Sequence, residues 1–219
     1  MDICKNHVRE LLEGIVSQPD KVIAECDIFI HELLKWNARV NLTSIVTPTE
    51  CWEKHIQDSL LPLPYLQHET SLLDIGSGAG LPSIPLKLCL PEMVITSVDK
   101  VRKKINFQNH CKRLLKLKNF NATTVRLEHI LCSEKKYAIV TARALASLEE
   151  LIKLGSPHVE AGGVLLAMKS KVGDEEMERG QIAAEGAAME FERIIECRLQ
   201  PSGAERQLIF IRKKETVKL

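Results

Sequence analysis

The sequence predicts an α/β fold in which a mainly parallel sheet, covered by helices on both faces, follows a helical extension. Residues 1–68 show the apolar spacing of amphipathic helices, three and four residues apart. From Ser71 onward, short apolar runs alternate with helical stretches, a pattern typical of parallel sheets. The last two runs have no helix between them. We therefore expect a helical extension over residues 1–68 and an α/β domain over residues 69–219.

The extension is predicted from its periodicity and its helix boundaries. Apolar positions define the face of its main helix: Val22, Ile23, Cys26, Phe29, Ile30, Leu33 and Leu34. Asn37 and Asn41 are expected to break this helix. Thr47-Pro48 opens a second helix, because proline suits the first helical position, and the run 60–66 with its two prolines closes it.

Seven strand-like runs follow the extension. The first five are 71–75, 93–99, 121–125, 137–142 and 162–168. The last two, 191–199 and 207–211, are joined through Pro201-Ser202-Gly203, so we expect them to pair as an antiparallel hairpin. A seven-stranded, mainly parallel sheet is the result.

Composition excludes several classes of protein. The 219 residues include 45% hydrophobic and 27% charged residues, which argues against disorder. No apolar run reaches membrane-spanning length and the first residues do not resemble a signal peptide, so we expect a cytoplasmic protein with no membrane partner. The seven cysteines include no C-x-x-C pair, so we expect no disulfide framework and no metal.

Charge is more informative locally than over the whole chain. Thirty basic residues against 29 acidic ones leave a net charge of +1, which does not indicate a polyanionic partner. Between Asp99 and Lys118, however, there are eight basic residues and one acid. This stretch is either a solvated helix face or a surface that meets RNA phosphates.

The segment from Leu72 to Leu86 carries the clearest chemical motif. A buried-type strand with Asp74 runs into Gly76, Gly78 and Gly80, then into a helix, so backbone can approach a ligand without a Cβ in the way. Asp99 ends the next strand, where its carboxylate can accept both hydroxyls of a ribose. The third glycine comes one residue too early for a dinucleotide motif. The pattern favours S-adenosylmethionine, with a structural glycine turn as the alternative.

Five segments of the chain resemble one known family. They are WNARVNLTSI (36–45), KHIQDS (54–59), DIGSGAGLPSIPL (74–86), TARALASL (141–148) and GAERQLIFI (203–211). In order and spacing they are similar to the ribosomal small-subunit methyltransferase G family, also called glucose-inhibited division protein B. The resemblance implies a class I methyltransferase fold and methyl transfer from S-adenosylmethionine to N7 of guanine 527 in bacterial 16S rRNA, free or within the 30S subunit, by a monomer.

The resemblance also implies roles for individual residues. Together with the glycine motif it gives these cofactor-binding candidates: Asp74, Gly76, Gly78, Gly80, Leu81, Asp99, Leu127, Glu128 and Arg143. Two positions depart from the family pattern. Ser83 stands where glycine is common, and Lys100 stands where a small residue is usual. Both lie beside the expected cofactor site.

Arg143, His55 and Arg206 are the candidate catalytic residues. Guanine N7 carries a lone pair and no proton, so catalysis needs alignment and electrostatics rather than a general base. Arg143 can donate two parallel hydrogen bonds, with a structural ion pair as the alternative. His55 and Asp58 share one helix face, and Arg206 precedes the last strand. Trp36 is expected to pack in the core, with base stacking as the alternative.

Two other functions stay open at this point. One is a methyltransferase of the same fold that acts on another RNA or on a small molecule, and the basic stretch argues against the small molecule. The other is a non-catalytic RNA-binding or division-associated protein, against which the intact glycine motif and Asp99 argue.

Overall fold

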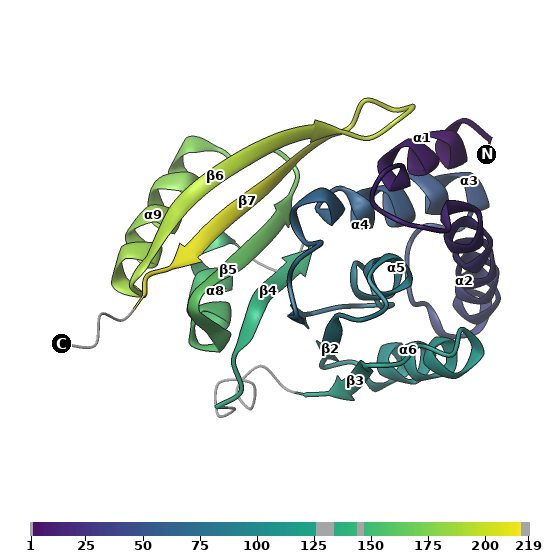
Figure 1. The fold of residues 1–219 in the computed structure, drawn as a ribbon, viewed down its shortest axis with the longest axis horizontal. Helices are drawn as coiled ribbons and strands as arrows, with labels where there is room; N and C mark the ends of the chain where they lie inside the picture. Colours follow the sequence, from purple (N-terminus) through teal and green to yellow (C-terminus); the bar gives the residue numbers. More distant parts are fainter. Residues whose placement is uncertain (1, 126–133, 144–146, 216–219) are drawn as a thin grey trace.

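The structure, a computed structural model, describes residues 2–125, 134–143 and 147–215. Its centre is one seven-stranded sheet in the order β3-β2-β1-β4-β5-β7-β6 (Figure 1). β1 to β5 run parallel, while β7 pairs antiparallel with both β5 and β6. The predicted α/β architecture, including its antiparallel hairpin, is confirmed.

The strands agree with the predicted runs to within a few residues. Their bounds are β1 Ser71–Ile75, β2 Val94–Asp99, β3 Phe120–Thr124, β4 Tyr137–Arg143, β5 Val159–Lys169, β6 Met189–Arg198 and β7 Glu205–Lys213. The helices between them are α5 Ser83–Cys89, α6 Arg102–Leu114, α8 Leu148–Gly155 with a 3₁₀ turn Ser156–His158, and α9 Asp174–Gly186.

The extension consists of short and long helices packed side by side. They are α1 Asp2–Leu12, α2 Pro19–Val40, α3 Pro48–Cys51, a π-helix Trp52–Gln57, α4 Asp58–Leu60 and a 3₁₀ turn Leu63–Tyr65. The start predicted at Thr47-Pro48 is confirmed, because the Thr47 side chain accepts a hydrogen bond from the Glu50 N–H at 3.3 Å.

The end of α2 differs from the prediction in one respect. The helix runs through Asn37 and ends only at Val40, with Asn41 in the left-handed region at φ 48°. Asn37 still terminates it, because its Oδ1 accepts from the N–H groups of Leu42 (2.6 Å) and Thr43 (2.9 Å). A buried amide side chain therefore fixes the loop that follows the helix.

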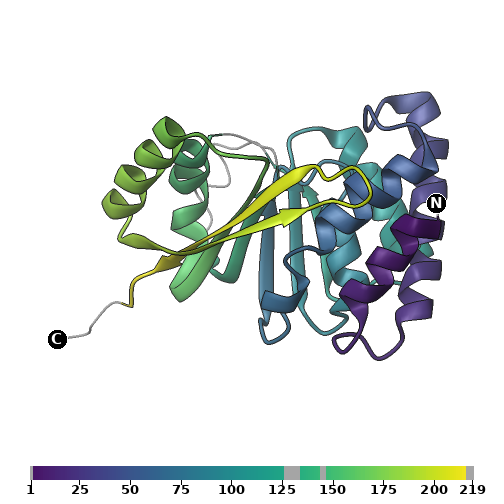
Figure 2. The ribbon, with the colours of Figure 1, turned by 90° about the horizontal axis from the view of Figure 1, so that it is seen from above.

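The alternation of side chains along the strands divides the core between the two faces of the sheet. Leu72 and Ile139 belong to the cluster shared with the extension, α5 and α6, whereas Leu73 and Val140 belong to the cluster under α8 and α9. Figure 2 shows these helices on opposite sides of the sheet. The first cluster crosses the boundary predicted between residues 68 and 69, so the extension and the sheet share one core.

Trp36 contributes to this shared core. Its ring lies 5.6 Å from that of Phe107 and 5.2 Å from that of His110, both on α6. The prediction that Trp36 packs against the sheet domain is confirmed.

Candidate active site

The glycine loop follows β1 and adopts a conformation that only glycine takes readily. Gly76, Gly78 and Gly80 have φ values of 73°, 58° and 88°. At Gly80 a Cβ would also lie 2.6 Å from the Ile84 side chain, so this position has no space for a larger residue. The loop thus presents bare backbone at the carboxyl end of the sheet, where α/β proteins bind ligands.

Gln108 on α6 fixes the loop from behind. Its Nε2 donates to Ser77 Oγ (2.8 Å) and to the Gly78 carbonyl (2.9 Å), and its Oε1 accepts from Ser97 Oγ (2.6 Å). The side chain is fully buried. A buried amide with satisfied hydrogen bonds holds the loop in one conformation.

Asp99 lies at the end of β2, facing the loop. Its Oδ2 accepts from the Gly78 N–H at 2.9 Å, its Oδ1 accepts from the Val101 N–H at 2.8 Å, and Lys104 Nζ is 4.0 Å from Oδ2. Each carboxylate oxygen has a second lone pair. Asp99 can therefore hold the loop and accept ribose hydroxyls at the same time.

Asp74 sits behind the loop and is completely buried. Burial raises its pKa to about 7. Its Oδ1 has no hydrogen-bond partner among the described residues. A buried carboxyl group behind the glycine loop favours a cationic ligand in front of the loop through its charge rather than by contact, and S-adenosylmethionine is such a ligand.

One cavity of about 620 Å³ joins these groups to the extension, a volume in the range of small-molecule sites. The glycine loop, the end of β2, the start of α6 and the residue after β3 contribute Gly76, Ser77, Gly78, Ala79, Leu81, Val98, Asp99, Lys100, Val101, Lys104 and Val125. The extension contributes Leu42, Thr43, Ile45, Lys54, His55 and Asp58, and the strand ends contribute Arg143, Met168, Lys169, Ser170 and Arg206. All three predicted catalytic residues line this cavity together with Asp99.

Arg143 and Arg206 share one carboxylate. Arg143 Nη1 donates to Asp58 Oδ2 at 2.9 Å and to the Lys54 carbonyl at 2.9 Å, and Arg206 Nε donates to Asp58 Oδ1 at 2.8 Å. The sequence analysis paired Asp58 with His55 on one helix face but did not place it among the site residues. The spacing of three residues between them was the available signal.

His55 is held by both of its ring nitrogens. Nε2 lies 3.0 Å from Thr43 Oγ1 and Nδ1 lies 3.2 Å from the Lys54 carbonyl, which assigns the proton to Nδ1. Burial, with the nearby charge of Arg143, lowers the pKa of His55 to about 4. This neutral imidazole holds Thr43 in the loop that lines the cavity.

The cavity lining is rich in positive charge. It includes two carboxylates, Asp58 and Asp99, and six cationic side chains, namely Lys54, Lys100, Lys104, Arg143, Lys169 and Arg206. Lys54 and Lys169 are not among the predicted site residues, and Lys104 is predicted only as part of the basic stretch, because nothing local distinguishes a pocket lysine from a solvated one. Such a lining suits a substrate that carries negative charge.

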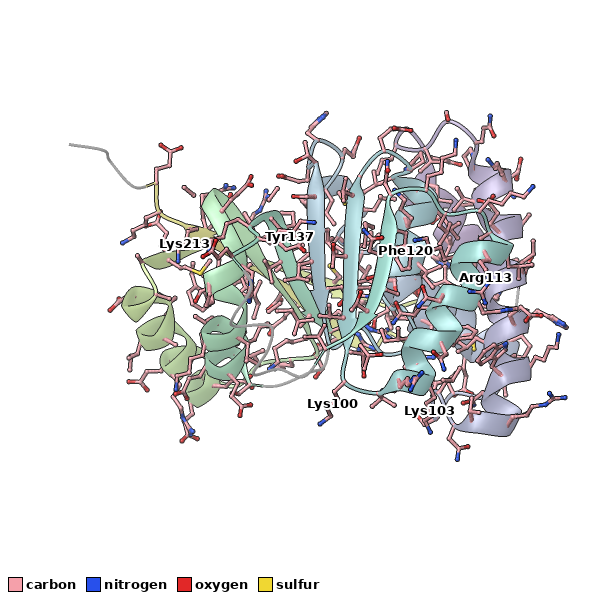
Figure 3. The ribbon with its side chains drawn as sticks, turned by 90° about the horizontal axis from the view of Figure 1, so that it is seen from below. Lys100, Lys103, Arg113, Phe120, Tyr137 and Lys213 are labelled. Carbon is pink, nitrogen blue, oxygen red and sulfur yellow. The ribbon has the colours of Figure 1, made fainter. Side chains whose placement is uncertain are left out.

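The basic stretch from Lys100 to Lys118 is divided between two places. Figure 3 shows Lys100 and Lys103 at the same edge of the molecule, whereas Arg113 lies further along α6. A helix of this length extends about 20 Å. Only the first half of the stretch, which includes Lys104, borders the cavity.

Two predicted cofactor contacts, Leu127 and Glu128, lie outside the described residues. Asp74 and Gly80 support the loop from behind and do not line the cavity. Within the described ranges no group of three or more His, Cys, Asp or Glu side chains could hold a metal ion. No helix in the same ranges is long and apolar enough to cross a membrane.

Several solved structures of methyltransferases match this chain by fold rather than by sequence. A ribosomal protein L11 methylase from Lactobacillus delbrueckii subsp. bulgaricus superposes with a TM-score of 0.56 at 17% identity, covering 73% of this chain and 79% of its own. M. jannaschii TYW2 in complex with AdoMet gives a TM-score of 0.55 at 13% identity, covering 68% of this chain and 70% of its own. The chain therefore has the fold of the class I S-adenosylmethionine-dependent methyltransferases.

Sequence comparison identifies the family within this class. The chain belongs to the rRNA small subunit methyltransferase G family, whose model matches residues 22–209. It is 39% identical over 213 residues to the ribosomal RNA small subunit methyltransferase G of Syntrophotalea carbinolica, covering 96% of this chain and 98% of the relative. The protein of the same name from Oceanobacillus iheyensis is 38% identical over 212 residues, covering 94% and 89%. The predicted resemblance is confirmed.

Proposed function

We propose that this protein methylates N7 of a guanine in bacterial 16S rRNA, the base that the family resemblance gives as guanine 527. One observation carries the proposal. A single cavity is lined by the glycine loop, by Asp99 and by six cationic side chains, which include Arg143 and Arg206. It therefore combines a cofactor site with a site for an anionic, guanine-bearing substrate.

Bound S-adenosylmethionine would supply an electrophilic sulfonium methyl group. We infer that Asp99 binds the ribose and that Gly76, Gly78 and Leu81 shape the cofactor site, with Asp74 and Gly80 holding the loop and Leu127 and Glu128 as further contacts from the family pattern. Both hydrogen bonds of Arg143 to the extension leave from Nη1, so its Nη2 edge is not engaged by the described residues. That edge suits the O6 atom of guanine.

The proposed acceptor requires no strong base in the site. Guanine N7 attacks with a lone pair and releases no proton, so no group has to remove one. The neutral His55, with both ring nitrogens engaged, fits a site that works by alignment. His55 therefore acts on the cavity wall, and Arg143 and Arg206 act on the substrate.

The substrate is the 16S rRNA, free or in the 30S subunit, and we infer that the protein acts in the cytoplasm, where ribosomes assemble. The test is transfer of a labelled methyl group from S-adenosylmethionine to free 16S rRNA and to 30S subunits from cells that lack this modification. Borohydride and aniline then cleave the strand at 7-methylguanine. A single cleavage at the expected guanine supports the proposal, and label at another base or in no RNA contradicts it.

A further inference from the structure

We propose that Asp58 is a positioning residue that sets the orientation of Arg143 and Arg206 toward the substrate. The inference rests on the proposed function and adds to it a residue of the helical extension. Asp58 is 6% exposed and directs one carboxylate oxygen to each arginine. The two arginines come from different strands, at the end of β4 and near the start of β7.

The shared carboxylate of Asp58 reduces the repulsion between the guanidinium groups of Arg143 and Arg206. Two guanidinium groups on one cavity wall repel each other, and their side chains are only 17% and 23% exposed, so water screens this repulsion poorly. A carboxylate between them offsets the repulsion and fixes both groups through directional hydrogen bonds. Without Asp58 we expect both arginines to turn toward solvent.

The position of Asp58 is itself fixed relative to β7. In the π-helix before it, Gln57 Oε1 accepts from the Gln200 N–H at 2.9 Å, and Glu53 Oε1 accepts from the Ser202 N–H at 3.1 Å. Both side chains are buried. Figures 1 and 2 show the connection between β6 and β7 over the N-terminal helices. The π-helix thus holds the turn that leads into Arg206, a use of irregular helix that is common at functional sites.

These contacts give Asp58 a role distinct from that of a general ion pair. Arg206 donates to the Glu205 carbonyl through Nη1 and to Asp58 through Nε, so its guanidinium plane is defined by two bonds. Arg143 is defined by Asp58 and the Lys54 carbonyl. Misplacing positioned donors by a small distance costs turnover more than binding.

The test is a double-mutant cycle between Asp58→Asn and Arg206→Gln, measured as kcat and KM for methyl transfer to RNA and as the Kd of S-adenosylmethionine. We expect Asp58→Asn to lower kcat about 10- to 100-fold while cofactor affinity changes less than about threefold. The loss in the double variant should be at least about fivefold smaller than the product of the single losses. Asp20→Asn, an exposed carboxylate of α2 whose partner is Arg9, is the matched control.

Two further measurements do not need the Asp58 variant to fold. Arg206→Lys keeps the charge but loses the Nε bond, so we expect kcat to fall about tenfold or more with an unchanged melting temperature. In the wild type, the Arg206 Nε–H should exchange slowly with water in ¹⁵N NMR spectra, a readout independent of any reaction. The role of Asp58 would be overturned by any of three results. The fall in kcat of the double variant could equal the product of the two single falls, the Arg206→Lys variant could remain fully active, or the Arg206 Nε–H could exchange rapidly. Failure of the wild type to methylate RNA would instead overturn the proposed function.

Discussion

The hydroxyl of Ser83 donates a hydrogen bond of 2.5 Å to Oδ2 of Asp74, and both side chains are fully buried. The sequence predicts that Ser83 departs from the family pattern, and this bond gives the serine a structural role. It satisfies one oxygen of a carboxyl group that burial would otherwise leave without a partner. The bond spans the glycine loop, from the end of β1 to the start of α5.

The first prediction concerns Asp74 and stability. Its pKa is about 7 in the folded protein and ordinary in the unfolded chain, so the folded state binds more protons between about pH 4 and 7, and stability falls as the pH rises through that window. The Asp74→Asn variant has no group that titrates at this position, so its stability does not fall with pH for this reason. Without cofactor, the variant should gain more stability at pH 8 than at pH 5, by about 1–3 kcal/mol.

Urea unfolding at the two pH values measures this difference, with Asp20→Asn as the exposed control. Equal gains at both pH values would show that Asp74 is already ionised in the folded state. The same variant should bind S-adenosylmethionine less tightly, because the amide no longer offers a negative charge.

The second prediction concerns the ribose contact. Asp99→Ala should weaken cofactor binding about tenfold or more, since a carboxylate that accepts hydroxyls contributes about 1.5–3 kcal/mol. Calorimetry measures the affinity, and circular dichroism checks that the loop, which also depends on Asp99, remains folded. Unchanged affinity in a folded variant would remove Asp99 from the site.

The third prediction concerns Arg143. Because its guanidinium faces the cavity, Arg143→Ala should lower turnover roughly a hundredfold per folded molecule, as expected for one positioned donor. The comparison needs kcat and the melting temperature together. A large fall in melting temperature with preserved turnover would mean that Arg143 is only an ion-pair partner of Asp58.

The fourth prediction uses the division of the basic stretch. Replacing Lys103 and Lys104 by Ala should flatten the slope of log RNA affinity against log salt by about one to two units, because phosphate contacts release counterions. Replacing Lys112 and Arg113 by Ala removes the same charge at the far end of α6 and should leave the slope nearly unchanged. If the two double variants behave alike, the RNA surface does not follow the cavity edge.

The fifth prediction concerns pH and His55. Its pKa of about 4 lies below that of the unfolded chain, so its contribution to stability is present above about pH 6.5 and is lost as the pH falls toward 4. Between pH 6 and 8 it stays neutral. Wild type and His55→Gln should therefore have parallel profiles of kcat against pH, and an inflection near pH 6.5 that disappears in the variant would identify His55 as a titrating catalyst.

Local patterns were sufficient for the sheet and the glycine loop. The strands are short apolar runs, and the loop glycines adopt positive φ as their spacing indicates. The end of α2 was harder to predict, because Asn37 stops the helix by bonding to residues five and six positions later while remaining helical itself. Sequence propensity describes the backbone of a residue and contains nothing about where its side chain reaches.

The sequence predicts the main side chains of the candidate site but not the contacts between them. Arg143, Arg206 and His55 are the predicted catalytic residues, and they line the same cavity. The carboxylate that joins the arginines depends on how the extension lies against β7, which is tertiary information. The basic stretch also depends on tertiary structure. Its basic residues are close together in the sequence, but α6 places those at its start and those at its end far apart.

The hydrogen bonds between the π-helix and the β6–β7 turn also determine when, during synthesis of the chain, the fold around the cavity can form. Glu53 and Gln57 are separated from Ser202 and Gln200 by 149 and 143 residues. A ribosome synthesises the π-helix well before this turn, so the buried acceptors of the π-helix stay without these donors while the residues between them are translated. Closing such long loops is entropically costly and slow. A growing chain that has not reached Gln200 contains the glycine loop but lacks these contacts, so we expect the capacity to act on RNA to arise only after this turn has been synthesised.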